Sequence, residues 1–402
     1  MKSILRSSLF LLLATSAFTI PACSEDVPPV VTAIFKSWET QLKATPAYDK
    51  VETDSSGNVT ISNLAAAIGV QDPGTSVKLS IGSIRLENVA AEADGLIGVG
   101  TATLSDTKVE FTGPDGKGVL IEIPKSGAED WYVSALGDNP TPLQAFRATM
   151  GIAKKMTSGE IKITAEGQTF AAKGIESAWS GDPVTGAGKT TMSLNELVIP
   201  EAVIAMLDPS GQLKALGYSD LTLNATGEGE LAVNGDNFGM SGTVGFSGKD
   251  MAGIKFTYGA SDIPMSVMAE LQAAQKAGRA ADFNMLMPQL MNVSLSGFQF
   301  RFEDASITKK VLPIIAKMQG MDEAAMVANA GAMMQIGLMQ LKNQAFTDQV
   351  VGAVNAFLND PRSITISLKP EAPVKVQQLM TLDPANPGAA VDVLGVSVTA
   401  ND

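Results

Sequence analysis

Few side chains in this sequence could perform covalent chemistry. Its 402 residues include no histidine and a single cysteine, Cys23. Nucleophiles activated by an imidazole base, histidine-ligated zinc and thiolate metal clusters are therefore excluded. A single cysteine also excludes a disulfide within the chain. We expect a protein that is not an enzyme, with no catalytic residue, no cofactor and no bound metal.

Two motifs that could contradict this expectation are incomplete. Gly186-Ala187-Gly188-Lys189 resembles part of a phosphate-binding loop, but Pro183 stands where the first glycine is required. The residues that follow alternate like a strand, so we interpret the motif as a glycine-rich hairpin turn. Acidic residues are plentiful, so a carboxylate pair for glycoside hydrolysis stays open. A sugar site usually stacks on aromatic rings, however, and the chain has only 3 Trp and 4 Tyr.

The charge and composition of the chain limit the classes of molecule that it can bind. Lys and Arg number 29 against 42 Asp and Glu, which gives a net charge of −13, and only 5% of residues are aromatic. Nucleic-acid binding relies on basic patches and stacking rings, so we expect no nucleic-acid partner. The composition is that of a globular protein.

Methionine is the unusual residue type. The chain has 19, of which 11 lie between residues 265 and 339. Packing in a helical core explains them most simply, an adaptable surface for a lipid or acyl chain is the second interpretation, and copper binding by thioethers is the third. In residues 324–341 the apolar side chains surround nearly the whole helix, so we expect this helix to be buried on most sides or to cover an apolar groove. The candidate ligand-lining residues are Met326, Met333, Met334 and Met339.

The N-terminus predicts export. Lys2 and Arg6 precede an apolar run that fades at Ile20, followed by the small residue Ala22. This order is typical of a secretory signal peptide, which we assign to residues 1–22. We therefore expect an exported, periplasmic protein.

Cys23 follows the signal peptide directly. This placement favours acylation of its thiol, as in bacterial lipoproteins, and a membrane tether at Cys23. Pro21 is unfavourable just before the Ala-Cys pair of such a site, so ordinary cleavage, which would leave a soluble protein with a free thiol, is the alternative.

Hydrophobic periodicity predicts an α+β fold. A helix opens at Pro28-Pro29, and alternation with a period of two then predicts strands on both sides of a turn at 113–116 and a three-stranded meander between 221 and 258. The alternation changes phase at Gly82-Ser83, which predicts a β-bulge. A degenerate repeat, Ser or Thr followed by apolar residues in two opposite phases, begins at Thr60, Ser80, Ser193 and Ser294 and is typical of long strands that switch faces.

Helices are concentrated in the C-terminal third. Thr141-Pro142 opens an earlier helix, and later helices are expected to begin at Asp262, Ser306 and Asp322. A fourth, marked by an apolar stripe from Phe346 to Leu358, is expected to end before Pro361. Strands are expected near 292–303, 363–368 and 394–399. We therefore divide the chain into a signal peptide (1–22), a mainly antiparallel β region (23–260) and a helix-rich region (261–402) that shares an elongated sheet with the region before it.

Four short motifs carry a resemblance to known proteins. They are Trp179-Ser180-Gly181-Asp182-Pro183, the run from Leu216 to Leu223, the run from Phe302 to Ser306 and the run from Phe357 to Ser363. Together they resemble uncharacterised exported proteins of proteobacteria, and the repetitive strands are similar to those of AsmA-like envelope proteins, which are thought to handle lipids. The resemblance implies a lipid-related role in the envelope and supplies no catalytic residue.

These observations predict an extended, curved antiparallel sheet packed against amphipathic helices. The leading functional hypothesis is a non-enzymatic cell-envelope protein that binds or shields a lipid or another apolar ligand between sheet and helices. The alternative is a structural or partner-binding envelope protein with a dry core, and a hydrolase ranks third.

Overall fold

The computed structural model describes residues 15–16, 27–42, 46–69, 74–135, 140–148, 150–276, 282–383 and 385–402. These residues form two compact units. Unit 1 contains the chain up to Leu197 together with Met265–Asp282, and unit 2 contains Val198–Pro264 and Phe283–Asp402. Every described strand pairing is antiparallel, and helices accompany the strands in both units, which confirms the α+β class.

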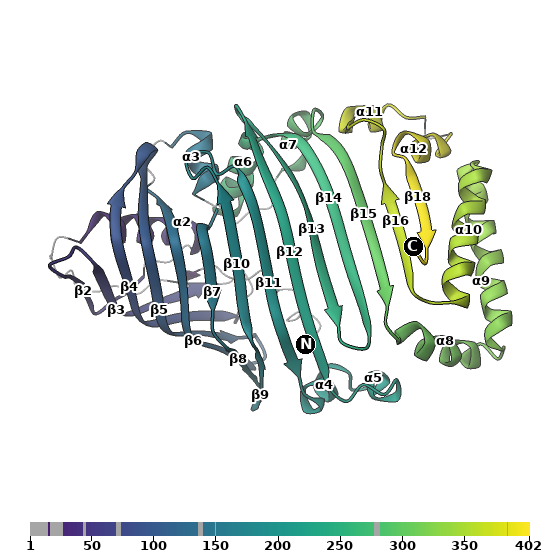
Figure 1. Cartoon of the computed structure of the whole chain (residues 1–402), viewed down its shortest axis with the longest axis horizontal. Coiled ribbons are helices and arrows are strands. Elements are labelled where there is room, and N and C mark those ends of the chain that lie inside the picture. Colours follow the sequence, from purple (N-terminus) through teal and green to yellow (C-terminus); the bar gives the residue numbers. More distant parts are fainter. Residues whose placement is uncertain are drawn as a thin grey trace. The chain divides into compact units, whose positions relative to one another are not determined.

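Unit 1 is a succession of long strands with few helices (Figure 1). Its elements are β1 (Thr15–Ser16), α2 (Pro29–Leu42), β2 (Lys50–Thr53), β3 (Val59–Gly69), β4 (Ser76–Ala91), η1 (Ala93–Gly95), β5 (Leu96–Thr112), β6 (Gly118–Ser134), α3 (Pro142–Arg147), β7 (Ile152–Ser158), β8 (Ile161–Ala165), β9 (Gln168–Ala172), β10 (Gly174–Gly181), β11 (Gly188–Ile199) and α6 (Met265–Lys276). Strands β3 to β6 pair in chain order, and β5 and β6 are joined by the expected turn at 113–116. The later strands pair less regularly, since β6 pairs with both β7 and β8, and β10 pairs with β7.

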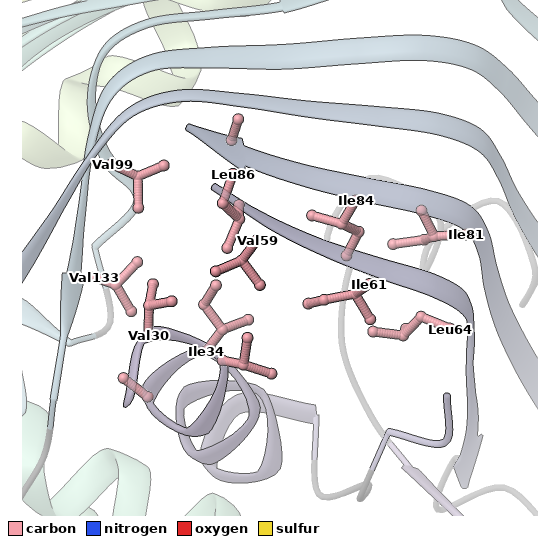
Figure 2. Close-up of a cluster of buried hydrophobic side chains, with 13 residues drawn as sticks. Val30, Ile34, Val59, Ile61, Leu64, Ile81, Ile84, Leu86, Val99 and Val133 are labelled. Atoms are coloured by element: carbon pink, nitrogen blue, oxygen red, sulfur yellow. The ribbon is translucent and has the colours of Figure 1, made fainter. Parts of the chain in front are cut away.

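The core of unit 1 lies between α2 and the strands from β3 to β6. Figure 2 shows Val30 and Ile34 of α2 facing Val59 of β3 and Leu86 of β4, with Val133 of β6 beside them. Ile34 is 1% and Leu86 0% exposed. Helical spacing on α2 and alternation on the strands both place their apolar side chains in this layer, so the core follows directly from the sequence pattern.

The long strands bend where Asn or Asp takes a positive φ. Asn63 in β3 (φ 50°) and Asp106 in β5 (φ 54°) stand on either side of Gly82 of β4. The flanking residues Ile81 and Ile84 are both buried, so β4 does change faces between them. The strand register is the same on both sides of Gly82, however, so no extra residue is inserted. The expected β-bulge is wrong, and the face change results from a kink shared by neighbouring strands.

Unit 2 begins with two short helices and a three-stranded meander and continues with further helices and strands. Residue 260, where the sequence suggested a boundary, lies inside this unit, and β12–β14 share their sheet with the later strands. The elements are α4 (Glu201–Leu207), α5 (Gln212–Ala215), β12 (Leu221–Asn234), β13 (Asn237–Gly248), β14 (Ala252–Pro264), α7 (Phe283–Leu290), β15 (Ser294–Asp304), α8 (Ile307–Met318), α9 (Glu323–Leu338), η2 (Met339–Leu341), α10 (Gln344–Asn359), β16 (Ser363–Leu368), β17 (Val374–Lys375), α11 (Val376–Met380), α12 (Gly388–Val393) and β18 (Val396–Ala400).

Most expected boundaries in unit 2 agree with these elements, and the signals that set them are visible. Asp322 caps α9 by accepting a hydrogen bond from the Ala325 amide at 2.7 Å, and Gly320 ends the preceding turn with a φ of 71°. One helix start is wrong. Asp262 lies inside β14 with a φ of 58°, and the expected helix, α6, begins only at Met265, because the strand continues to Pro264.

Candidate functional site: an apolar sheet face in unit 2

One face of the unit 2 sheet is apolar across five strands. Each strand alternates, and the register aligns the apolar positions in rows, one of which runs through Val244, Phe256, Phe300, Ile366 and Val398. The Phe256 and Phe300 ring centroids are 5.3 Å apart. We call the following set the apolar face, and none of its members is charged: Met240, Val244, Phe246, Ile254, Phe256, Tyr258, Phe298, Phe300, Phe302, Ile364, Ile366, Leu368, Val396, Val398 and Ala400.

Helix α10 covers only one end of this face. Val350 and Ala353 of α10 form a buried cluster with Val398 of β18, and the Phe357 ring meets that of Phe302 edge-on at 5.9 Å. In Figure 1 the long strands β12–β15 lie next to one another, and α10 stands beside β18. Because α10 contacts β16 and β18 and reaches Phe302 of β15, its cover ends within β15, and the part of the face on β13 and β14 lies beyond it.

The uncovered part is accessible. Phe246 and Phe298 are each 40% exposed, Ile366 is 39% exposed and Met240 is 39% exposed. Large apolar side chains at this exposure, spread over one sheet face without a charge between them, form the kind of patch that soluble proteins usually reserve for a ligand or partner.

The opposite face of the same sheet is polar and carries an ionic network. Arg301 donates from Nε to Glu303 at 2.9 Å and from Nη1 to Asp402 at 2.7 Å, and Lys255 donates to Glu303 at 3.2 Å. The hydrogen bond from Arg301 holds the pKa of the Glu303 carboxyl below its ordinary value. The pKa of Asp402 is also lowered, first by the hydrogen bond from the Thr399 hydroxyl and then by Arg301. One face of this sheet is therefore apolar and the other is polar and charged, as the alternation of residues along each strand predicts.

A hollow of about 290 Å³ also lies on the unit 2 strands. Ser241, Thr257, Gln299, Ser367 and Lys369 contribute polar side chains to its lining. Tyr258, Phe298 and Leu368 of the apolar face also line it, so this hollow adjoins the apolar face.

The candidate methionines occupy helix α9 and the turn after it, and two of the four have most of their surface in solvent. Met333 is 74%, Met339 67% and Met334 37% exposed, while Met326 is half-buried. Only Val327 and Gly331 of α9 are buried, so the expectation that this helix is buried on most sides is wrong. The three cavities found on the sheets, including the hollow above, are not lined by these methionines.

The packing of α9 explains this exposure. It contacts α10 rather than the sheet, and a Cβ at Gly331 would come within 2.8 Å of the Asn355 side chain of α10. Met333, Ile336 and Met339 recur every three residues and lie on the side of the helix away from Val327 and Gly331. They therefore face away from α10 and from the apolar face that α10 covers. The segment Glu323–Leu341 is, by length and composition, long and apolar enough to cross a membrane, and 11% of it is buried.

Of the four short motifs that carry the resemblance to exported proteins, three come together where α8 begins. The Tyr218 hydroxyl lies 3.0 Å from the Ser306 hydroxyl, and Ser306 in turn donates to the Asp250 carbonyl at 2.5 Å. The Lys310 ammonium sits over the Tyr218 ring, 3.7 Å from its centroid. The Asp304 amide donates to the Arg362 carbonyl at 2.7 Å.

This serine, tyrosine and lysine cluster does not form a catalytic arrangement. The Ser306 proton is already donated to a backbone carbonyl, and the Lys310 ammonium is directed at the ring face rather than at either hydroxyl. Tyr218 is only 5% exposed. The cluster therefore fastens the start of α8 to the β13–β14 turn.

Sequence reasoning missed a buried arginine in unit 1. Arg147 at the end of α3 is 2% exposed and donates to the Ser134 hydroxyl at 3.2 Å, to the Asp94 carboxylate at 2.9 Å and to the Val184 carbonyl at 2.7 Å. It ties together η1, α3 and the glycine-rich turn between β10 and β11, which the structure confirms as a hairpin turn. All its partners are accounted for, so this arginine is structural.

Two remaining predictions concern anchoring and metals. Cys23 lies outside the residues that the structure describes. Within the described ranges, no group of three or more His, Cys, Asp or Glu side chains is placed to hold a metal ion.

Comparison with known proteins matches part of the chain. Residues 245–401 match a family model described as "Uncharacterized protein". No curated protein matches the chain. The matched span runs from the middle of β13 to β18, and so includes most of the apolar face together with α8, α9 and α10.

Proposed function

We propose that this chain is an exported, non-enzymatic cell-envelope protein that binds the acyl part of a lipid on the apolar face of unit 2. The observation that carries the proposal is the uncovered part of that face, where Phe246, Phe298 and Ile366, on three different strands, are each about 40% exposed. Burying such a surface against hydrocarbon is favourable by about 25 cal/mol per Å² of apolar area removed from water.

The chemistry of the face favours an acyl chain over a polar ligand. Its side chains offer rings and branched aliphatic groups, and Tyr258 supplies the one hydroxyl among them. A ligand with many hydrogen-bonding groups would lose its bonds to water on this surface without replacing them. The similarity of the strands to those of AsmA-like envelope proteins supports the same ligand class.

Binding of a fluorescent fatty acid, 11-(dansylamino)undecanoic acid, tests the proposal. We expect the double substitution Phe246→Ser and Phe298→Ser to weaken binding by about tenfold or more, because each ring contributes roughly 1–2 kcal/mol of apolar contact. The matched control is Ile175→Ser with Met192→Ser, which removes two exposed apolar side chains from strands of unit 1, where they are 37% and 52% exposed. The control should bind the probe like the wild type.

Two results would overturn the proposal. One is a wild-type protein that neither binds the probe nor carries lipid in native mass spectrometry after detergent-free purification. The other is an equal loss of binding in the Phe pair and in the unit 1 control. Either result would favour the structural or partner-binding alternative.

The candidate methionines are tested by a separate variant. Met333→Gln with Met334→Gln should leave the fold intact, because Met333 is 74% and Met334 37% exposed. Since the exposed side of α9 faces away from the sheet, we expect probe affinity to change by no more than about twofold. A large loss of affinity would show that α9 forms part of the lipid site.

The membrane anchor is a further part of the proposal. If Cys23 is acylated, Cys23→Ser should move the protein from the membrane fraction to the soluble periplasm after cell fractionation. A wild-type protein that is already soluble would refute the anchor without affecting the lipid site.

A further inference from the structure

Helix α8 combines positive charge with exposed apolar side chains. It contains Lys309, Lys310 and Lys317 and no acidic residue, in a chain whose net charge is −13. Lys310 is held over the Tyr218 ring, whereas Lys309 and Lys317 are exposed and make no ion pair within the part of the chain that the structure describes. The helix is therefore a local cationic site on an acidic protein.

The same helix exposes large apolar residues next to these lysines. Ile314 is 41%, Ile315 36% and Met318 82% exposed. Leu312 and Ala316 are buried and hold the helix against the rest of unit 2. A helix with lysines beside exposed Ile and Met is typical of segments that lie in the interface of a lipid bilayer.

Helix α9 adds a second apolar surface. It contacts α8, and no charged residue occurs between Glu323 and Lys342. Its outward side carries Met333, Ile336 and Met339, each at least 67% exposed.

We infer that α8 docks unit 2 onto the surface of an anionic lipid bilayer, with the outward side of α9 entering the same interface. Lys309 and Lys317 would contact lipid phosphates, and Met318 with its neighbours would enter the acyl boundary. The net charge of the whole chain opposes this contact, so the attraction must be local and must weaken as salt is added. The inference goes beyond the lipid site on the apolar face, since it concerns a different surface and binding to the membrane itself.

Vesicle cosedimentation tests this docking. The full-length protein carrying Cys23→Ser, which removes any covalent anchor, is mixed with vesicles of phosphatidylcholine containing about one third phosphatidylglycerol, and with pure phosphatidylcholine vesicles. We expect binding to the anionic vesicles that falls steeply between 50 mM and 500 mM salt. Lys309→Glu with Lys317→Glu should lower the partition coefficient at least about tenfold, because each lysine near an anionic surface contributes several-fold.

A matched control variant distinguishes the effect of the local charge on α8 from the effect of the net charge of the chain. Lys369→Glu with Lys375→Glu makes the same change in net charge on exposed lysines outside α8. This control should keep wild-type binding, and the milder Lys309→Gln with Lys317→Gln serves if the glutamates disturb the fold. No binding of the Cys23→Ser protein to anionic vesicles, or equal losses in both lysine pairs, would overturn the inference. Neither result depends on the fatty-acid probe, so the two proposals fail separately.

Discussion

Replacing Arg147 by Met should destabilise unit 1 more than the same change at Arg85, the other arginine that the structure describes in this unit. The guanidinium is 2% exposed and donates to four acceptors, at 2.7, 2.8, 2.9 and 3.2 Å. Methionine keeps much of the apolar stem but leaves the carbonyls of Asp94 and Val184 without their donor. Each buried acceptor that loses its partner costs about 1–3 kcal/mol.

The expected total is about 3–4 kcal/mol of unfolding free energy. It lies toward the lower end of the ~3–5 kcal/mol found for broken buried pairs, because the Asp94 carboxylate is 41% exposed and water can replace part of its contact. Arg147→Lys keeps a charge but loses the fork of the guanidinium, so an intermediate loss is expected.

Tryptophan fluorescence during urea unfolding measures this loss of stability, because the fluorescence reports on unit 1. The three tryptophans, Trp38, Trp131 and Trp179, all belong to unit 1. The matched control is Arg85→Met, which removes an arginine whose side chain is 47% exposed and whose ion pairs are at the surface, and should cost below about 1 kcal/mol. Equal losses for the two variants would refute the assignment of Arg147 as the structural tie of this region.

Two further outcomes concern unit 2. Gly331→Leu should loosen α9 from α10 and speed hydrogen exchange in α9, because a Cβ there would already come within 2.8 Å of the Asn355 side chain and leucine adds three further carbons. Gly337→Ala meets nothing within 4 Å and should stabilise the helix by about 0.5–1 kcal/mol. Equal exchange in the two variants would contradict this packing. The carboxyls of Glu303 and Asp402, whose pKa values are both lowered partly by Arg301, stabilise the fold fully above their ordinary pKa values of 4.5 and 3.8 and lose this contribution as pH falls through their lower folded values. Circular dichroism during urea unfolding between pH 3 and 7 should show this loss, and a slope unchanged by Glu303→Gln with Asp402→Asn would contradict it.

The apolar face could be predicted in large part from the sequence. Phe298, Phe300 and Phe302 alternate with polar residues, and this period of two fixes which face each side chain joins once the strand is recognised. The extent of cover by helices could not be predicted in the same way. It depends on α10 packing at β16 and β18, which is a long-range contact that alternation within a strand does not encode.

The misjudged features share this physical cause. Arg147 looks like an exposed residue in a short helix, because its acceptors come from residues 37 and 53 positions away in the chain. The composition of α9 shows that it is apolar but not that its main neighbour is another helix. The phase change at Gly82 is visible in the sequence, whereas the unchanged register of the neighbouring strand is not.

The span matched by the family model includes both the apolar face and helix α8. Residues 245–401 hold Phe246, Phe298 and Ile366 as well as the lysines of α8, while the kinked strands of unit 1 lie outside the match. Tyr218 also lies outside it, yet its hydroxyl and ring fasten Ser306 and Lys310 at the start of α8. The contact of that helix with its sheet thus depends on a residue that the match does not include. Removing the ring and hydroxyl with Tyr218→Ala should therefore free the start of α8 and speed hydrogen exchange there, while leaving the rows of the apolar face intact.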